Sequence, residues 1–302
     1  SIFANRMPKN IGRSCLTPLI GKRGGIAGDF TVTHLEKDKF LIIGSGMAER
    51  YHSRYFKSVP LPGNVSFESI TEKMCGFNVA GPKSREMLSR LSNADFSTEL
   101  FPFMTAKRIN LLGLSVIAVR VSFTGDLGWE LYCDTVDQVE LYNSLVTIAK
   151  ELNGGPIGSR ALMSLRIEKG YGSWSREYSP EYWPQEVGLS KLIKLDKDFL
   201  NKEAYIKIKD KKPREMLRII EVVDAKIADA TGGEPIFSID GAPIGRVTSG
   251  AYCAGVGKSL ALVFIKSSII DVEMHVMILG KPHLAKLLDE PPFDPKGLKL
   301  RS

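Results

Sequence analysis

The sequence has few of the residues that build metal centres and disulfide frameworks. It contains four cysteines and four histidines in 302 residues. The cysteines, at Cys15, Cys75, Cys133 and Cys253, form no Cys-x-x-Cys pair, and the histidines show no His-x-His or His-x-x-x-His spacing. We therefore predict no metal site, and we interpret the cysteines as reduced core thiols in a reducing compartment.

Long apolar runs are also absent. The strongest candidates, such as FLIIG and LALVFIK, fall short of the roughly 18 residues that cross a bilayer. We expect a soluble protein without a membrane partner, cytoplasmic or, in a eukaryote, in the mitochondrial matrix. The chain opens SIFANRMPKN, without an initiator methionine or a signal pattern. We interpret it as part of a longer polypeptide rather than as a processed one.

Nucleotide-site and hydrolase signatures are missing as well: the sequence has no GxGxxG, Walker, GxSxG or HExxH motif. The 41 basic and 34 acidic residues give a net charge of +7, but the basic residues are dispersed. Their densest stretch, residues 191–215, mixes acids with lysines and lacks the interleaved aromatics of a nucleic-acid platform. We expect no nucleic-acid partner. The stretch is either a solvated face or the source of a modest field for a small polyanion.

The hydrophobic periodicity predicts a mixture of helices and strands in two domains, an α+β domain over 1–208 and an all-β domain over 209–302. A helix with Pro82 near its start is expected up to Leu91, and another over 160–169 with Ser159 as N-cap. A third is expected within 135–153, stopped by Gly154 and Gly155, with an apolar face of Val139, Tyr142, Leu145, Val146, Ala149 and Leu152. A hairpin is expected over 30–46, and two strands flank the TGDLG turn. In the second domain strands are expected within 216–223, 233–250, 258–265 and 271–288, with a turn at Asp240-Gly241.

Three charged residues stand at positions that do not favour them. Asp29 follows GGIAG where a turn becomes a strand, and Arg160 stands in the first turn of a helix, where the dipole does not favour a cation. On local grounds Asp29 could equally close a turn by bonding backbone N–H groups. Arg166, in the same helix as Arg160, and Glu186, in PQEVGL, are further charged residues among apolar neighbours.

Glu130 is the most informative of these acids. Strand alternation in GWELYC places it opposite Trp129 and Leu131, and a carboxylate inside a strand is unfavourable unless something binds it. A planar ligand with adjacent N–H donors, such as a pterin, could bind it in a bidentate manner. An edge-strand glutamate on the solvent face remains the alternative.

Seven blocks of the sequence resemble, in order, the glycine-cleavage T-protein (aminomethyltransferase) family. They are GGIAGDFTV, VAGPKSREML, RVSFTGDLGWELY, GSRALMSLRIEKG, PQEVGL, FLNKEA and IGRVTSGAYC. GWELY and RALMSLRIEKG are most similar to relatives fused behind an FAD domain in dimethylglycine and sarcosine dehydrogenases. The resemblance implies an α+β, three-lobed folate-binding fold with a C-terminal β-barrel-like domain, in which the N-terminal part of the first lobe is missing before Ser1.

The resemblance also implies roles for individual residues. Asp29 falls on the family's catalytic acid, Glu130 on its pterin-binding glutamate and Arg160 on its folate-binding arginine. It further places in the folate site Phe123, Asp126, Trp129 and Lys281. Phe123 and Asp126 stand where many members have Tyr and Glu, and Gly28 before Asp29 matches the single acid of the dehydrogenase branch.

The activity implied is tetrahydrofolate-dependent one-carbon transfer that forms 5,10-methylenetetrahydrofolate from an amine-derived donor. Tetrahydrofolate would be the cofactor of this chain, and FAD would belong to a presumed upstream domain. The alternatives are a free-standing glycine-cleavage aminomethyltransferase with a lipoyl carrier protein as partner, and a regulatory or scaffold protein that keeps the fold without the chemistry.

Overall fold

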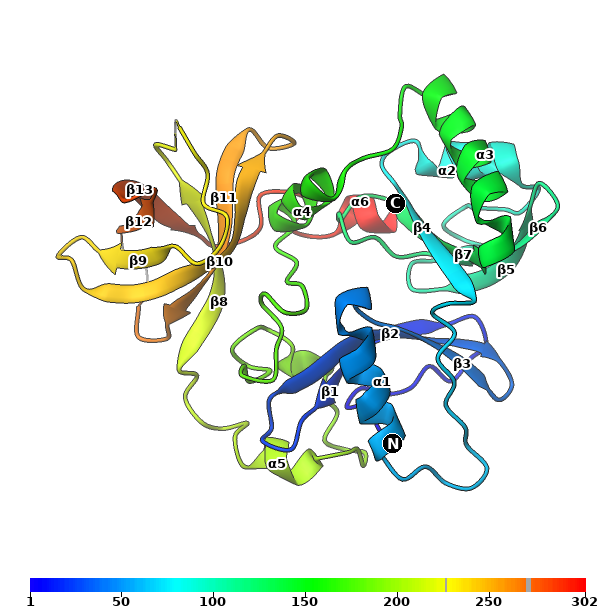
Figure 1. Cartoon of the computed structure of the whole chain (residues 1–302), viewed down its shortest axis with the longest axis horizontal. Coiled ribbons are helices and arrows are strands. Elements are labelled where there is room, and N and C mark those ends of the chain that lie inside the picture. The colour runs from blue at the N-terminus through cyan, green and yellow to red at the C-terminus, as the bar shows by residue number, and fades with distance from the viewer. Residues whose placement is uncertain (226, 270–272) are drawn as a thin grey trace. The chain divides into compact units, whose positions relative to one another are not determined.

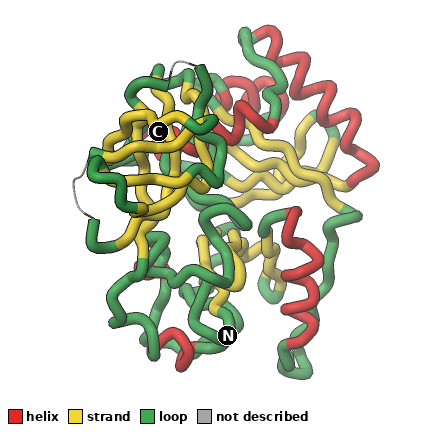
Figure 2. The backbone as a smooth tube through the Cα atoms, turned by 60° about the vertical axis from the view of Figure 1, so that its left-hand side comes forward, coloured by secondary structure: helices red, strands yellow, loops and turns green. Residues whose placement is uncertain are grey.

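The computed structural model describes residues 1–225, 227–269 and 273–302. These residues form two compact units, each made of three segments. The first unit contains Ser1–Arg6, Leu16–Asp29 and Gly158–Lys296, and the second contains Met7–Cys15, Phe30–Ile157 and Gly297–Ser302. Figures 1 and 2 trace the mixture of helices and strands that confirms the predicted α+β class.

The second unit is built on a four-stranded antiparallel sheet of order β4-β7-β6-β5. Its elements are β4 (Met74–Ala80), α2 (Ser84–Leu91), β5 (Ala106–Leu111), β6 (Leu114–Val119), β7 (Gly128–Asp134) and α3 (Gln138–Glu151). Alternation along β7 sends Trp129, Leu131 and Cys133 into the core with Leu88 and Leu145 of the two helices. The sheet thus has one face under α2 and α3 (Figure 1), and Glu130 belongs to the opposite face.

Helix α3 forms where the sequence predicts it, with part of the predicted apolar face inward. Leu145 and Leu152 are buried and Ala149 packs against the core, as expected. Val139 and Tyr142, expected on the same face, are 69% and 44% exposed, and Leu141 is buried instead. The packing against α2 and the sheet, which sequence periodicity does not contain, decides which residues at the start of the helix face inward.

A three-stranded sheet, β1-β2-β3, precedes these elements. It contains β1 (Ser14–Ile20), β2 (Ile26–Glu36) and β3 (Lys39–Ile43), and α1 (Glu49–Ser58) follows. The predicted hairpin of β2 and β3 is confirmed. Asp29, however, lies inside β2 and not before it. The Ile26 N–H donates to the Tyr182 carbonyl at 3.0 Å, so the extended segment starts before Asp29 is reached.

In the first unit, six strands close into a barrel of order β10-β11-β8-β13-β12-β9 (Figure 1). They are β8 (Glu215–Val222), β9 (Pro235–Ser238), β10 (Pro243–Cys253), β11 (Lys258–Lys266), β12 (Met274–Ile278) and β13 (Lys281–Leu288). Gly241 in the predicted turn has φ +86°, a conformation that glycine adopts readily. Asp271 and Val272, which open the last predicted strand run, lie outside the described residues.

Helix α4 (Ser159–Glu168) covers part of the barrel. Its Ile167 packs on the outer side of β11 against Leu260 and Leu262, while Val263 and Ile265 of the same strand point into the barrel. Because both faces of β11 are buried, its sequence is a continuous apolar run rather than an alternating one. The N-cap of α4 is Gly158 and not Ser159.

The smaller helices are α5 (Lys202–Ile206) in the first unit and α6 (Leu298–Arg301) in the second. Short 3-10 turns occupy Gly46–Ala48, Thr135–Asp137 and Ser190–Leu192. Within the described ranges no helix combines the length and the apolarity needed to span a membrane.

Candidate folate site

Asp29 is a half-buried carboxylate of the first unit, and one of its oxygens has no described partner. Its Oδ1 is shielded from solvent, and no described residue forms a hydrogen bond with it. Burial raises the pKa of Asp29 from 3.8 to about 6, and a bond to the backbone N–H of Asp29 itself offsets this only in part. A turn-closing aspartate would bond the N–H groups that follow it. The orphaned oxygen instead favours a role toward a ligand.

The local backbone explains how an acid comes to be held there. Position 25 has no room for a side chain, because a Cβ on Gly25 would lie 2.3 Å from the Pro180 carbonyl oxygen. Gly24 before it has φ +84°. The segment around Pro180 therefore approaches the start of β2 closely. Tyr178, in the same segment, lies within electrostatic range of Asp29. Burial, and next the Asp29 carboxylate, raise the pKa of the Tyr178 phenol.

Glu130 is the corresponding carboxylate of the second unit. It is half-buried on β7, opposite Asn78 of β4 and Val119 of β6. Burial raises its pKa, and a hydrogen bond from the Tyr132 hydroxyl to Oε2 at 2.5 Å lowers it. No described cation forms an ion pair with Glu130. Tyr132 was not among the predicted site residues, although its position two residues after Glu130, on the same strand face, is visible in the sequence.

The other predicted residues of this unit lie on either side of the sheet. Phe123 and Asp126 are half-buried in the turn between β6 and β7, near the hydrogen-bonded hydroxyls of Ser122 and Thr124. Trp129 is fully buried between Phe96 and Phe101, with its rings edge-on to both. Because its side chain reaches no surface of the unit and faces away from Glu130, we assign Trp129 to the core rather than to a binding surface.

The two predicted cations of the first unit are exposed. Arg160 stands in the first turn of α4, and Lys281 opens β13 in the turn after β12. Among the described residues, no hydrogen bond or ion pair joins either of them to Asp29. The convergence of Asp29, Glu130 and Arg160 on one ligand stays a prediction.

Arg166, a charged residue among apolar neighbours in the sequence, belongs to a buried charged cluster of the first unit whose acid, Glu177, was not predicted. Arg166 and Glu177 have no exposed side-chain surface, and Nη1 of Arg166 donates to Oε2 of Glu177 at 2.9 Å. The hydroxyls of Thr248 and Ser249 donate to the other carboxylate oxygen, Oε1. All acceptors of this pair are satisfied within the fold, so we interpret the cluster as structural.

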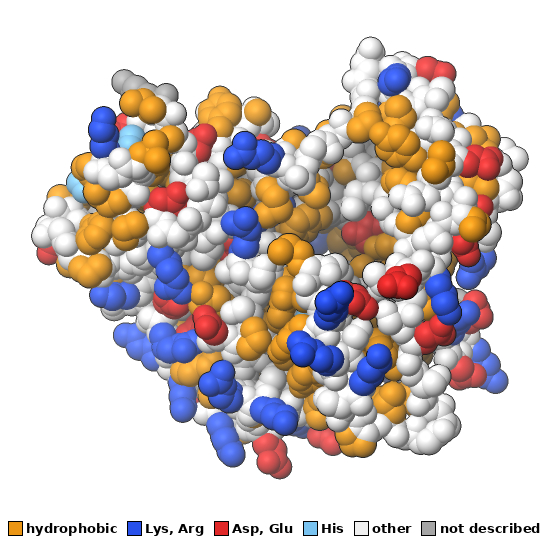
Figure 3. Space-filling view, viewed as in Figure 1, with side chains coloured by type: hydrophobic (Ala, Val, Ile, Leu, Met, Phe, Trp, Pro, Cys, Tyr) orange, Lys and Arg blue, Asp and Glu red, His pale blue; other side chains and the backbone are white. Residues whose placement is uncertain are grey.

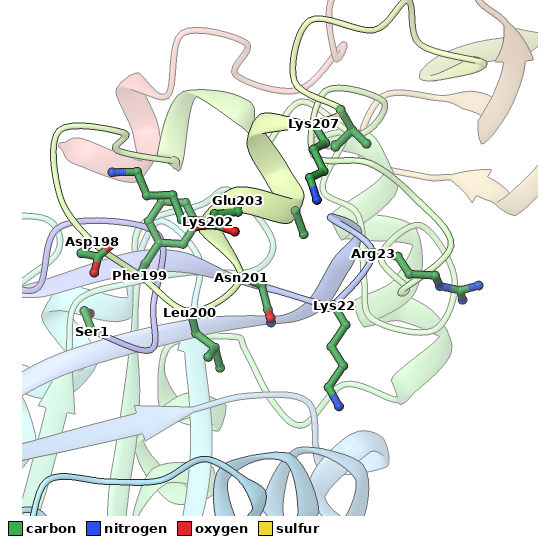
Figure 4. A pocket seen from close by; sticks show the side chains of 12 residues that line it. Ser1, Lys22, Arg23, Asp198, Phe199, Leu200, Asn201, Lys202, Glu203 and Lys207 are labelled. Carbon is green, nitrogen blue, oxygen red and sulfur yellow. The ribbon is translucent and has the colours of Figure 1, made fainter.

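The first unit also contains a pocket of about 740 Å³. Lys22 and Arg23 lie on one side of it, and Asn201 and Lys207 lie on the other (Figure 4). Asp29, Arg160 and Lys281 do not line it. The pocket is therefore a different site from the one that the predicted folate residues of this unit would form. On the face drawn in Figure 3, many Lys and Arg side chains lie at the lower left, with a few Asp and Glu side chains among them.

Comparisons with known proteins identify the family. Residues 1–197 match the family model described as the GCVT N-terminal domain, and residues 216–294 match the glycine cleavage T-protein C-terminal barrel domain. The chain belongs to the glycine cleavage T-protein family. The second match coincides with the closed barrel of β8–β13, and both confirm the resemblance found in the sequence.

Relatives of the chain include a dehydrogenase and an aminomethyltransferase. The chain is 31% identical to mitochondrial dimethylglycine dehydrogenase of Homo sapiens over 96% of its own length but only 34% of that protein. It is 28% identical to aminomethyltransferase of Thermotoga sp. (strain RQ2), over 93% of this chain and 76% of that protein. The chain thus spans about a third of the dehydrogenase.

A solved structure confirms the fold. Aminomethyltransferase T of the glycine cleavage system of Bartonella henselae matches with a TM-score of 0.81 at 18% identity, over 95% of this chain and 77% of that one. At this identity the match establishes the aminomethyltransferase-like fold with its C-terminal barrel.

Proposed function

We propose that this chain transfers a one-carbon unit to tetrahydrofolate, as the folate module of an N-demethylating flavoprotein related to dimethylglycine dehydrogenase. Family membership and 31% identity along 96% of the chain support the proposal. The single Asp29 after Gly28, where T-proteins often have two acids, favours the same branch. FAD would belong to a part of the parent protein outside this chain.

The observation that carries the proposal is the orphaned Oδ1 of Asp29. A buried carboxylate oxygen without a donor is costly, and such atoms are concentrated at functional sites. Tetrahydrofolate would supply the amine nitrogens that accept the one-carbon unit, and its pterin ring carries the N–H donors that a lone carboxylate needs. Asp29 and Glu130, two half-buried acids without a described cation partner, fit such a ligand.

Asp29 would act on the proton of the accepting nitrogen. With a pKa of about 6, its carboxylate is mostly ionised at neutral pH and remains basic enough to take a proton. While ionised, it would also stabilise positive charge that develops beside it. Glu130 would hold the pterin through its N–H donors, and Arg160, exposed at the start of α4, would meet the carboxylates of the folate tail.

Two substitutions separate binding from transfer. Binding is measured by calorimetric titration with tetrahydrofolate, and transfer by coupled reduction of NADP⁺ as 5,10-methylenetetrahydrofolate forms. Glu130→Gln is expected to weaken binding by roughly 1–3 kcal/mol, because a charged hydrogen-bond acceptor becomes neutral. The exposed Glu140 on α3 provides the control variant, Glu140→Gln, which is expected to bind like the wild type.

Asp29→Asn is expected to bind tetrahydrofolate within a few-fold of the wild type but to lose roughly 10²–10⁴-fold in transfer rate. An equal loss of both would show that Asp29 is structural.

The donor used by the wild-type protein tests the alternatives. Transfer only from an aminomethylated lipoyl carrier would support the free-standing aminomethyltransferase alternative. Binding without transfer from either that carrier or an enzymatically oxidised N-methyl amine would support the regulatory alternative.

A further inference from the structure

We infer that Tyr132 is a positioning residue for Glu130 and that it leaves Oε1 and the second lone pair of Oε2 for the pterin; this inference rests on the proposed function. The two residues stand two apart on β7 and share the face of the sheet that α2 and α3 do not cover. The Tyr132 hydroxyl donates to Oε2 of Glu130 at 2.5 Å. Among the described residues, no other side chain donates a hydrogen bond to Glu130.

The ring of Tyr132 is held in place from two sides. Its register partner on β4 is Gly76, and a Cβ there would lie 2.9 Å from Cε1 of the ring. The ring also packs against a small apolar cluster that includes Ile117, its register partner on β6, and Val119. A phenol fixed in this way holds its hydroxyl at one place along the strand, so it selects one orientation of the Glu130 side chain.

This arrangement defines what Glu130 can bind. Tyr132 supplies one donor to Oε2, and no cation among the described residues neutralises the carboxylate. The complementary ligand therefore brings its own donors, one to Oε1 and one to the second lone pair of Oε2, as an aminopyrimidine edge with adjacent N–H groups does. The bond from the phenol also lowers the pKa of Glu130 and so opposes the effect of burial, which raises it.

A positioning role for Tyr132 predicts a change in the pH dependence of binding that a packing role alone does not predict. Without the phenol, Glu130 takes up its proton at a higher pH, and the protonated acid is a poorer acceptor. For Tyr132→Phe we expect roughly tenfold weaker binding of tetrahydrofolate at pH 7. We also expect the fall of affinity on acidification to begin at a higher pH than in the wild type.

The experiment is a double-mutant cycle by calorimetry with tetrahydrofolate from pH 5 to pH 8, under anaerobic conditions. It compares the wild type, Tyr132→Phe, Glu130→Gln and the double variant. In the Glu130→Gln background, Tyr132→Phe should change the affinity less than twofold, because the group it acts on is gone. Tyr142→Phe, at an exposed position on α3, is the matched control.

The outcomes distinguish failure of the positioning role of Tyr132 from failure of the pterin assignment of Glu130. If Glu130→Gln binds as tightly as the wild type, the pterin assignment of Glu130 fails. If Glu130→Gln weakens binding but Tyr132→Phe leaves the pH profile unmoved, or lowers affinity equally in both backgrounds, Tyr132 only packs and the inference is overturned. Gly76→Ala is a second variant that displaces the ring and keeps the hydroxyl. It should shift the pH profile as Tyr132→Phe does, and an unchanged profile in a folded Gly76→Ala protein would also contradict the inference.

Discussion

At the scale of single residues, the candidate site consists of acids that the fold itself does not need. Burial raises the pKa of both Asp29 and Glu130, and neither has a described cation partner. The buried acid Glu177, by contrast, is fully paired with Arg166 and two hydroxyls. Unpaired buried charge lowers stability, so its presence is better explained by what it binds than by what it supports.

This contrast leads to a prediction for the stability of Asp29→Asn. The folded protein binds the Asp29 proton more tightly than the unfolded chain, since the pKa is about 6 instead of 3.8. The free energy of unfolding therefore falls as pH rises through that window and stays lower above it. At pH 8, Asp29→Asn should be more stable than the wild type by up to about 3 kcal/mol. The difference should shrink toward zero near pH 4.

Urea denaturation at pH 4, 6 and 8 measures this difference. Asp38→Asn, in the exposed turn between β2 and β3, is the control and should show no such pH dependence. A variant at position 29 that is less stable than the wild type at pH 8 would mean that the carboxylate forms a structural bond, as the turn-closing interpretation requires.

At the scale of elements, the pairing of β4 with β7 brings together two cysteines that are distant in the sequence. Cys75 and Cys133 are direct register partners with their sulfurs 3.2 Å apart, and both are free thiols. Cys133 is 2% exposed, and burial raises its pKa to about 12, whereas Cys75 is half-buried on the edge strand. Because 58 residues separate them along the chain, the sequence alone does not predict that the two thiols are neighbours.

We expect oxidised glutathione to convert this pair into a disulfide. The Cys75 thiolate displaces one glutathione and forms a mixed disulfide, and the Cys133 sulfur then displaces the second. Intact mass in denaturant should show the loss of two hydrogens, and the closed loop should stabilise the unit by about 4 kcal/mol in the chain-entropy estimate. Cys15→Ser should behave like the wild type and Cys75→Ser should not react. A glutathione adduct that persists on Cys75 would show that the strands hold the sulfurs apart.

Elements with strong local signals were predictable, and their orientation was not. The β2–β3 hairpin, the strand positions around TGDLG and the Asp240-Gly241 turn follow from periodicity and turn chemistry. The sequence did not show that β2 starts before Asp29, because the bond that starts it comes from Tyr182. The inward residues at the start of α3 and the burial of Trp129 likewise depend on partners distant in sequence.

At the scale of the whole molecule, the chain is interlaced between its two units. It passes from one to the other at residues 6/7, 15/16, 29/30, 157/158 and 296/297. The third of these crossings, from Asp29 to Phe30, occurs within β2, so the proposed catalytic acid ends the second segment of the first unit. Such a layout depends on contacts between distant segments, and local composition gives no sign of it. The predicted boundary at 208/209 instead follows the change from a mixed sequence to a strand-rich one, close to the start of β8.

The buried cluster around Glu177 joins three distant segments of the first unit and gives the last prediction. Arg166 comes from α4, Glu177 from the following loop, and Thr248 and Ser249 from β10. Glu177→Ala leaves the Arg166 charge buried and unpaired, which is expected to cost about 3–5 kcal/mol in unfolding free energy. Chemical denaturation measures it, with Glu181→Ala, at an exposed position of the same loop, as the control.

A second variant distinguishes loss of the pair from loss of packing. Adding Arg166→Met to Glu177→Ala removes the unpaired charge and places an apolar side chain of similar length beside β10, so it should recover a large part of the lost stability. Tetrahydrofolate affinity of the folded double variant should equal that of the wild type, because neither residue belongs to the proposed site. If the second substitution instead adds its own loss, the cluster contributes through hydrogen bonds to Thr248 and Ser249 rather than through neutralisation of Arg166, and the electrostatic account of this junction is wrong.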